Sequence, residues 1–252
     1  MAAPLEQVAA PLEQVAAPLE QVEAPLEQVA APLEQMEAPL EQVAAPLEQV
    51  EAPLEQMAAP LEQSFLFDIL RGLAYCHSQG VIHRDLKLHS MLLDPQNNRI
   101  KIAGFGQSRM FPTRSGVYTP KVGTLRYKSP EILLGSKRYS PSIDMWSVGC
   151  IFAEMLLSRH LFSGNDVREQ LVVIFSIVGT PSVDTWPGFS DMPDFEPSFY
   201  NIPCKNWTQL FPSLEEDGID LISRMLLLDP ERRIDAQTAL GHDYFLNHGF
   251  EA

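Results

Sequence analysis

A short run of residues, His83-Arg84-Asp85-Leu86-Lys87, places one carboxylate among imidazole, guanidinium and ammonium groups. A carboxylate in such surroundings can accept a proton from a reacting hydroxyl, and a nearby ammonium can neutralise developing negative charge. A second run, Gly104-Phe105-Gly106, follows further along the chain. Side chains of these types can take part in proton transfer or in the binding of anions.

Both runs resemble conserved motifs of protein kinases. In the kinase pattern H-R-D-L-x-x-x-N, the Asp accepts the proton of the substrate hydroxyl, while the Asn and the Asp of D-F-G hold the magnesium ions that bridge the ATP phosphates. Here Asp85 is present, but Ser90 stands in place of the Asn and Gly104 stands in place of the D-F-G Asp. The resemblance thus implies a catalytic loop that has Asp85 and Lys87 as its catalytic residues and lacks its two expected metal ligands.

Further matches follow in the order of the family, from about residue 65 to about residue 245, and resemble the C-terminal lobe of a cyclin-dependent kinase. They are Tyr118-Thr119, Thr124-Leu125, Ser129-Pro130-Glu131, Asp144-Met145-Trp146-Ser147-Val148-Gly149, Gly179-Thr180-Pro181, Trp186-Pro187-Gly188 and Leu228-Asp229-Pro230-Glu231-Arg232-Arg233. This resemblance implies a mainly α, kinase-like C-terminal lobe.

The same resemblance implies contacts that hold this lobe together. Asp144 would bind the backbone of the catalytic loop, and Glu131 would pair with Arg233. Charge-assisted hydrogen bonds of this kind stabilise a fold whether or not the protein catalyses a reaction. Their presence therefore supports the fold and leaves the activity open.

A phosphorylation site is implied in the same way. Thr119 stands near the end of the segment that the family phosphorylates, and Arg84 with Arg109 would receive the phosphate. Arginine pairs well with phosphate because its planar guanidinium can donate two parallel hydrogen bonds. The expected modification site is thus Thr119, with Arg84 and Arg109 as its partners.

Several parts of a working kinase are missing from the sequence. No G-x-G-x-x-G-x-V loop occurs, because Arg109 stands where the last glycine after Gly104 and Gly106 would be. The first lysine is Lys87, so no phosphate-binding lysine precedes the catalytic loop. We also recognise no cyclin-contacting helix. No cofactor is expected, and ATP with magnesium would bind only if another lobe completed the site.

The spacing of apolar residues predicts the elements that position these residues. An amphipathic helix is expected over residues 65–77, with Gly80 as its C-terminal cap. Two short runs around a turn, at residues 91–93 and 100–102, predict a β-hairpin. Further helices are expected over residues 140–157, 166–178, 214–227 and 236–240. A long Pro-rich connection is expected over residues 180–212.

Residues 1–63 repeat the heptapeptide A-P-L-E-Q-[VM]-[AE], with a proline in each unit. The apolar residues of the units, such as Leu5 and Val8, have the spacing of a coiled-coil seam, which would make the segment an oligomerisation helix. A proline inside a helix costs about 3 kcal/mol, and here it recurs in every heptad. Short helical turns or a disordered low-complexity arm are therefore favoured, followed by the kinase-like lobe over residues 64–252.

Negative charge is concentrated in this repeat. Residues 1–63 carry twelve Glu and no Lys or Arg, and the whole chain has a net charge of −15, which leaves −3 for residues 64–252. An acidic segment repels nucleic acid and anionic membranes, so neither is expected as a partner. Three cysteines without zinc-type spacing, and an N-terminus without a signal sequence, indicate a cytoplasmic or nuclear protein with reduced thiols.

Three functions fit these features. The leading hypothesis is an inactive pseudokinase that binds other proteins, with the region around Trp186-Pro187-Gly188 as its contact surface. The second is an active Ser/Thr kinase whose N-terminal lobe comes from another polypeptide or from a longer version of this chain. The third is a truncated duplicate without function. Nucleotide binding and cooperative unfolding distinguish the three.

Overall fold

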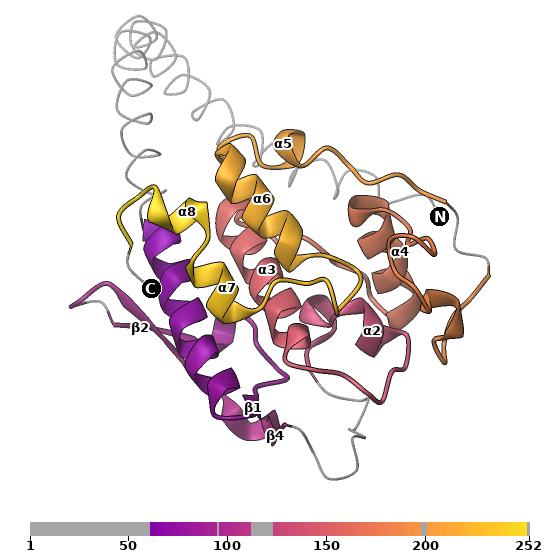
Figure 1. Ribbon diagram of the computed structural model, residues 1–252, viewed down its shortest axis with the longest axis horizontal. Helices are drawn as coiled ribbons and strands as arrows, with labels where there is room; N and C mark the ends of the chain where they lie inside the picture. Colours follow the sequence, from indigo (N-terminus) through magenta and orange to yellow (C-terminus); the bar gives the residue numbers. More distant parts are fainter. Residues whose placement is uncertain (1–60, 95, 112–122, 198–200, 251–252) are drawn as a thin grey trace, which may run out of the picture. The chain divides into compact units, whose positions relative to one another are not determined.

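The computed structural model describes residues 61–94, 96–111, 123–197 and 201–250. The repeat up to residue 60 lies outside the described residues, and so does the predicted phosphorylation site Thr119. Within the described part, most regular structure is helical and the strands are short (Figure 1). The prediction of a mainly α fold is therefore confirmed.

The first described helix covers residues 61–78 and begins earlier than predicted. Its buried apolar side chains are spaced by three and four residues and form one face of the helix, at Leu66, Ile69, Leu70 and Leu73. Gln63, from the last repeat unit, is also buried and donates a hydrogen bond to the carbonyl of Tyr244. The helix ends shortly before Gly80, whose φ of 69° favours glycine. Residues 61–63 of the repeat are thus part of this helix.

The described strands form two antiparallel pairs. They are β1 (Val81–Ile82) with β4 (Arg109–Met110), and β2 (Met91–Asp94) with β3 (Arg99–Ile102). The second pair confirms the predicted hairpin and places Leu92 opposite Lys101. Two 3-10 helices, η1 (Leu88–Ser90) and η2 (Phe105–Gln107), lie before β2 and after β3.

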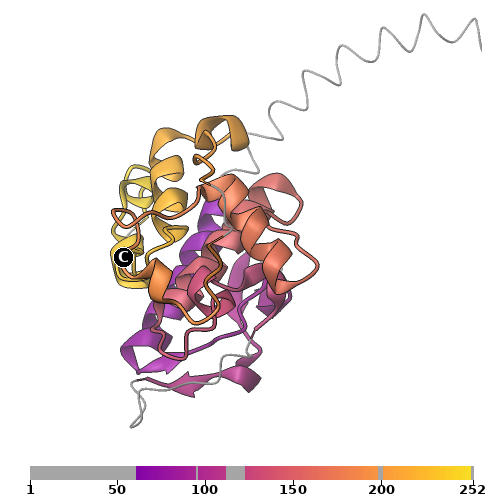
Figure 2. The same ribbon diagram turned by 90° about the vertical axis from the view of Figure 1, so that its right-hand side faces the viewer.

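The remaining helices form the body of the lobe. They are α2 (Pro130–Leu133), α3 (Ser142–Leu157), α4 (Val167–Val178), α5 (Trp207–Leu210), α6 (Glu216–Met225), α7 (Ala236–Leu240) and α8 (Asp243–Leu246). Helix α3 is buried over its first three turns and packs against α6, while α2 contacts α4. In Figure 2 the orange and yellow helices, from α5 onward, lie above the magenta strand at the bottom of the view. The catalytic loop therefore joins the strands to a helical core.

Most of the predicted helices are present with small changes in their bounds. The bounds of α3 agree closely with the prediction, and those of α7 match it fully. Helix α4 begins after Asp166, whose side chain accepts a hydrogen bond from the backbone N–H of Glu169 at 2.8 Å. Helix α6 is shorter than the predicted helix over residues 214–227. The sequence did not predict α8, and the Pro-rich connection contains η4 (Phe189–Asp191) and α5.

One large apolar cluster unites these helices. Trp146 of α3 is fully buried and stacks on Phe162, with the ring centroids 5.5 Å apart. The first described helix joins the same cluster through Phe67, whose ring contacts Phe245 at a centroid distance of 5.1 Å. A lobe held in this way can fix the catalytic loop from several sides.

Among the described residues, no helix is long and apolar enough to span a membrane.

Candidate functional site

The catalytic loop is fixed by one buried carboxylate. Asp144, in the first turn of α3, is 1% exposed and accepts hydrogen bonds from the backbone N–H groups of His83 and Arg84, both at 2.8 Å. His77 Nε2 lies 2.9 Å from Asp144 Oδ2. The contact that the resemblance implied between Asp144 and the loop backbone is therefore confirmed, and His77 joins it.

These bonds hold a strained backbone. Arg84 has a φ of 70°, in the left-handed region that residues with a side chain rarely adopt. Its guanidinium is bound on two sides, since Nε donates to the carbonyl of Gln107 at 2.6 Å and Nη1 donates to the hydroxyl of Tyr139 at 3.1 Å. Strain of this kind persists only where the surroundings determine the conformation. The loop is thus preorganised by side chains from distant parts of the chain.

The two candidate catalytic residues lie together. Lys87 Nζ donates to Asp85 Oδ2 at 3.2 Å, and the hydroxyl of Thr124 donates to Asp85 Oδ1 at 2.8 Å. Lys87 Nζ also lies 3.2 Å from the Thr124 hydroxyl. Burial lowers the pKa of the neighbouring Lys128, while the charge of Asp85 acts in the opposite direction. The arrangement presents a partly exposed carboxylate that can accept a proton.

The two positions expected to bind metal face each other. Ser90 is 5% exposed, its hydroxyl donates to the carbonyl of Asp85 at 3.2 Å, and its own carbonyl accepts a hydrogen bond from Ala103 N at 2.9 Å. A Cβ atom placed on Gly104 would lie 3.5 Å from the Ser90 hydroxyl oxygen. The fold therefore brings Ser90 and Gly104 together as a kinase would bring its metal ligands together.

The chemistry of these two positions does not match the chemistry of magnesium. Mg²⁺ prefers an octahedral set of hard oxygen ligands, usually with one or two carboxylates, and then bridges the phosphates of the nucleotide. Ser90 offers one neutral hydroxyl that already serves a protein carbonyl, and Gly104 has no side chain. Across the described ranges, no three His, Cys, Asp or Glu side chains are grouped as a metal site would require. These residues do not fit a magnesium–nucleotide cofactor.

The predicted phosphate-binding arginines differ in their surroundings. Arg84 is 7% exposed and engaged by Gln107 and Tyr139, whereas Arg109 is exposed in β4. Thr119, the residue that would carry the phosphate, lies outside the described residues. Phosphorylation of Thr119 therefore stays a prediction.

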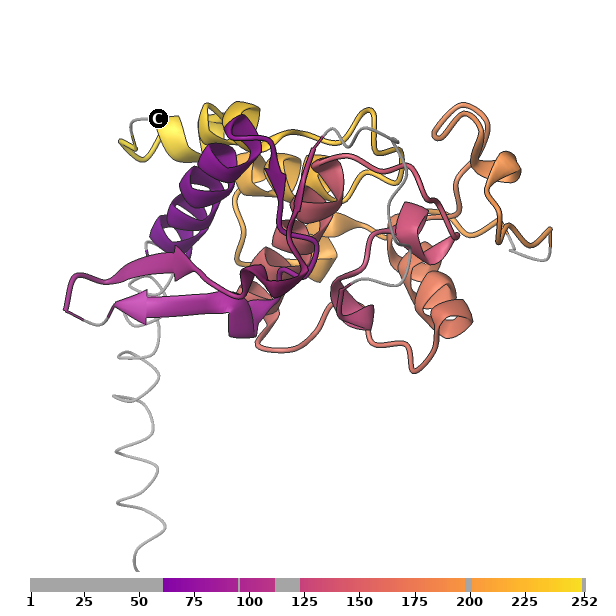
Figure 3. The ribbon, with the colours of Figure 1, turned by 90° about the horizontal axis from the view of Figure 1, so that it is seen from below.

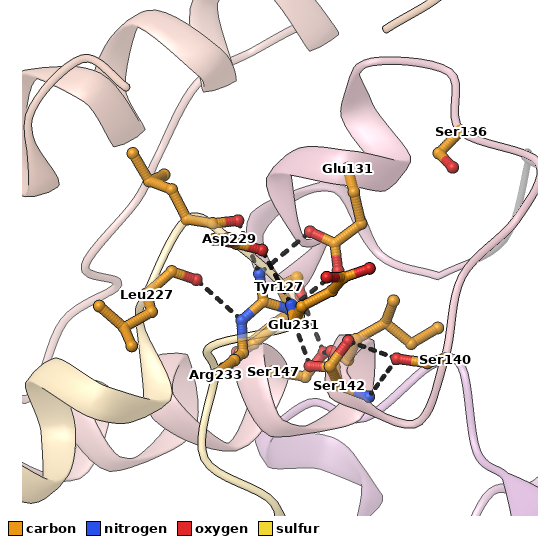
Figure 4. Close-up of polar contacts among 12 residues, drawn as sticks. Tyr127, Glu131, Ser136, Ser140, Ser142, Ser147, Leu227, Asp229, Glu231 and Arg233 are labelled. Carbon is orange, nitrogen blue, oxygen red and sulfur yellow. Dashed lines mark hydrogen bonds and ion pairs between the residues drawn. The ribbon is translucent and has the colours of Figure 1, made fainter. Parts of the chain in front are cut away.

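Figure 4 shows the second implied contact, an ion pair that joins α2 to the segment before α7. Arg233 Nη1 and Nη2 bind the two carboxylate oxygens of Glu131 at 2.8 and 3.1 Å, and both side chains are almost fully buried. The guanidinium also donates to the carbonyls of Ser142 and Leu227, each at 2.9 Å, and lies 5.2 Å from the ring centroid of Trp146. The predicted Glu131–Arg233 pair is confirmed.

A further set of contacts, not predicted from the sequence, ties the segment after Thr124 to α3. The Ser147 hydroxyl donates to the carbonyl of Tyr127 at 2.8 Å, and the Tyr127 hydroxyl donates to Glu154 at 2.5 Å. Burial and the neighbouring Glu154 carboxylate raise the pKa of Tyr127 well above its ordinary value. Tyr127 lies in η3 (Leu125–Tyr127), directly after Thr124. These bonds therefore help to hold Thr124 against Asp85.

Sequence reasoning missed Thr124 and His77 as site residues. Thr124 meets Asp85 across 39 residues of sequence, and His77 meets Asp144 across 67 residues. Neither residue has a local pattern that signals a contact of this range. The hydroxyl of Thr124, in a segment that already resembled the family, was the only available indication.

The sequence profile of one protein family, described as Protein kinase domain, matches residues 41–245. The match covers well over half of the chain and includes the catalytic loop, Ser90, Gly104 and the Glu131–Arg233 pair. It ends where the resemblance to the kinase lobe ends in the sequence, and it begins within the repeat. The chain therefore belongs to the protein kinase family.

Proposed function

We propose that this chain is a cyclin-dependent-kinase-like protein that acts as a protein-binding module and not as a phosphotransferase. The observation that carries the proposal is the pair Ser90 and Gly104, which face each other without a carboxylate or an amide. Enzymatic phosphoryl transfer depends mainly on positioning and on neutralisation of phosphate charge by metal ions and cationic groups. A proton acceptor such as Asp85 cannot supply that neutralisation.

Preserved structural contacts support the binding role. Asp144 and the Glu131–Arg233 pair keep the lobe folded, although the metal ligands are replaced. Near the predicted contact surface, Trp186 is 2% exposed and belongs to the core, whereas Pro187 is exposed and Val183 is 78% exposed. Proteins can bind at such a surface without any nucleotide. We therefore extend the proposal to protein partners that recognise the lobe outside its catalytic loop.

The test combines thermal unfolding with a phosphate-transfer assay on the purified chain. A ligand that binds only the folded state stabilises it by about 2.7 kcal/mol at one hundred times its dissociation constant, which raises the melting temperature. We expect a cooperative transition that magnesium–ATP leaves unchanged, and no transfer to a protein substrate. Transfer that the Asp85→Asn variant abolishes would overturn the proposal.

A second function is favoured by one observation, the intact set of Asp85, Lys87 and Thr124. Under this alternative the chain is an active Ser/Thr kinase whose N-terminal lobe is supplied by another polypeptide, and ATP with magnesium is its cofactor. Transfer by the chain isolated from cells together with its partners, lost in Asp85→Asn, would support it. A purified chain without any cooperative transition would instead favour a duplicate without function.

A further inference from the structure

A groove lies between the first described helix and the hairpin of β2 and β3, and its lining includes neither Asp85 nor Lys87. Figure 3 shows the hairpin beside this helix. The groove has a volume of about 870 Å³ and is open to solvent along its length. A space of this size is within the range of sites that bind small ligands or peptide segments.

The groove is preformed by contacts at its floor. Arg99 Nε donates to both carboxylate oxygens of Asp68, at 2.7 and 2.9 Å, and Ile100 N donates to Asp68 Oδ2 at 2.9 Å. Beside them, Gly72 allows the helix to approach the hairpin closely, because an added Cβ would lie 3.1 Å from Ile102 Cδ1. A rigid floor lowers the entropy that binding would otherwise lose.

The net charge of the side chains that line the groove is positive. The charge of Asp68 is matched by Arg99, and Asp94 accepts hydrogen bonds from Asn97 Nδ2 at 3.0 Å and from the backbone of Gln96. Arg71 and Lys101 are exposed, and neither forms an ion pair within the described part of the chain. Asp94 keeps its negative charge, because the hydrogen bonds from Asn97 and Gln96 and the nearby charge of Lys101 lower its pKa. Three cations, at Arg71, Arg99 and Lys101, therefore face two carboxylates, which leaves the groove with a net charge of +1.

Aromatic surface lies next to these cations. Tyr75 is 69% exposed and Phe105 is 44% exposed, and both line the groove. Exposed aromatic rings are common anchors for apolar side chains at protein interfaces. A positive rim is unusual here because the lobe of residues 64–252 carries a net charge of −3. Both features together favour a ligand that carries acidic and apolar side chains.

We propose that this groove binds an acidic peptide segment of a partner protein, with carboxylates at Arg71 and Lys101 and an apolar side chain against Tyr75. This inference rests on the proposed function in one respect, because it takes the ligand to be a segment of another protein. Since the groove does not use Asp85, Ser90 or Gly104, peptide binding and phosphate transfer can be measured separately.

The first experiment measures binding of a fluorescent synthetic peptide of Glu, Leu and Ala to the full chain by fluorescence polarisation. The double variant Arg71→Glu/Lys101→Glu should weaken binding by about tenfold or more, since two attractions become repulsions. The matched control Lys137→Glu/Arg138→Glu changes two exposed cations outside the groove and should bind like the original chain. Binding should also weaken as salt is added.

A second measurement locates the peptide. Cys76 lines the groove, so bound peptide should slow its alkylation, while the exposed Cys204 should react at an unchanged rate. Tyr75→Ala removes exposed aromatic surface without touching the core and should weaken binding several-fold. Equal affinity of both charge-reversal variants, or no protection of Cys76, would overturn the inference. Phosphate transfer by the original chain would overturn the inactive assignment and leave the groove unaffected.

Discussion

Two regions of this lobe match positions with a defined role in kinases, and they differ in whether the kinase side chains are present. Around Glu131, Arg233 and Asp144, the charged groups are present, buried and fully hydrogen-bonded. At Ser90 and Gly104, both groups that would bind metal are replaced by neutral residues. The first region holds the fold and the second would perform the chemistry.

The difference follows from what each loss does to the folded state. Removing one partner of a buried ion pair leaves an unpaired charge and destabilises a protein by about 3–5 kcal/mol. Removing two facing metal ligands, one Asn and one Asp, has a smaller or opposite effect, because an Asp carboxylate that lacks its metal has no partner for its charge. The Asn and the Asp of the kinase motifs can therefore be replaced, as they are here by Ser90 and Gly104, without unfolding the lobe, whereas Arg233 cannot be replaced alone.

The largest predicted effect breaks the buried ion pair. Arg233→Met leaves the Glu131 carboxylate without its partner in a site where both side chains are almost fully buried. We expect the free energy of unfolding to fall by about 3–5 kcal/mol, measured by urea denaturation.

Two controls sharpen this prediction. The double variant Glu131→Gln/Arg233→Met should recover part of the loss, because no unpaired charge remains. Arg168→Met removes one partner of the solvent-exposed pair Arg168–Glu196 and should change stability by less than about 1 kcal/mol. Equal losses in the Arg233 and Arg168 variants would show that burial does not set the strength of these pairs.

Much of the fold could be predicted from the sequence because its signals are local. The bounds of α3 and α7 follow from apolar spacing and from cap residues, and the hairpin follows from two short runs around a turn. Helix α8 covers only Asp243–Leu246, which is too short to show a periodic pattern. The early start of the first described helix depends on a tertiary contact between Gln63 and Tyr244, which no local rule predicts.

The site could be predicted only where it resembles a known motif. Asp85, Lys87, Ser90 and Gly104 were found because their order is fixed along the chain. The close approach of Ser90 to Gly104 depends on how β2 and β3 pair, and the role of Thr124 depends on the folding of a distant segment. Sequence patterns give residue order, whereas these contacts arise from tertiary packing.

The second prediction restores the missing ligands. In Ser90→Asn/Gly104→Asp, two oxygen donors should face each other, and Mg²⁺ at ten times its dissociation constant should stabilise the variant by about 1.4 kcal/mol. Gly104 has a φ of 88°, so the Asp will be strained, although Asp and Asn tolerate this region better than other residues. Thermal unfolding with increasing Mg²⁺ measures the gain.

The comparison variant Ser90→Ala/Gly104→Ala carries the same backbone strain without oxygen donors. Its melting temperature should fall and should not respond to Mg²⁺. If Mg²⁺ raised the melting temperature of the original chain as much as that of Ser90→Asn/Gly104→Asp, Ser90 and Gly104 would not have lost the ability to bind metal. The contrast with the region of the buried ion pair would then be wrong.

The smallest predicted effect uses Cys150, which lies on α3 in the region of the ion pair. Burial raises the pKa of its thiol far above the usual 9.0, while the charge of Arg233 acts in the opposite direction. The folded state therefore keeps this proton at pH values where the unfolded chain releases it, so stability is retained below pH 9 and lost as the pH rises further. Between pH 8 and 9.5 the loss of stability from this thiol is on the order of 1 kcal/mol. Urea denaturation should show a shallower alkaline decline in Cys150→Ala than in the original chain, and an unchanged slope would mean that water reaches this part of the core.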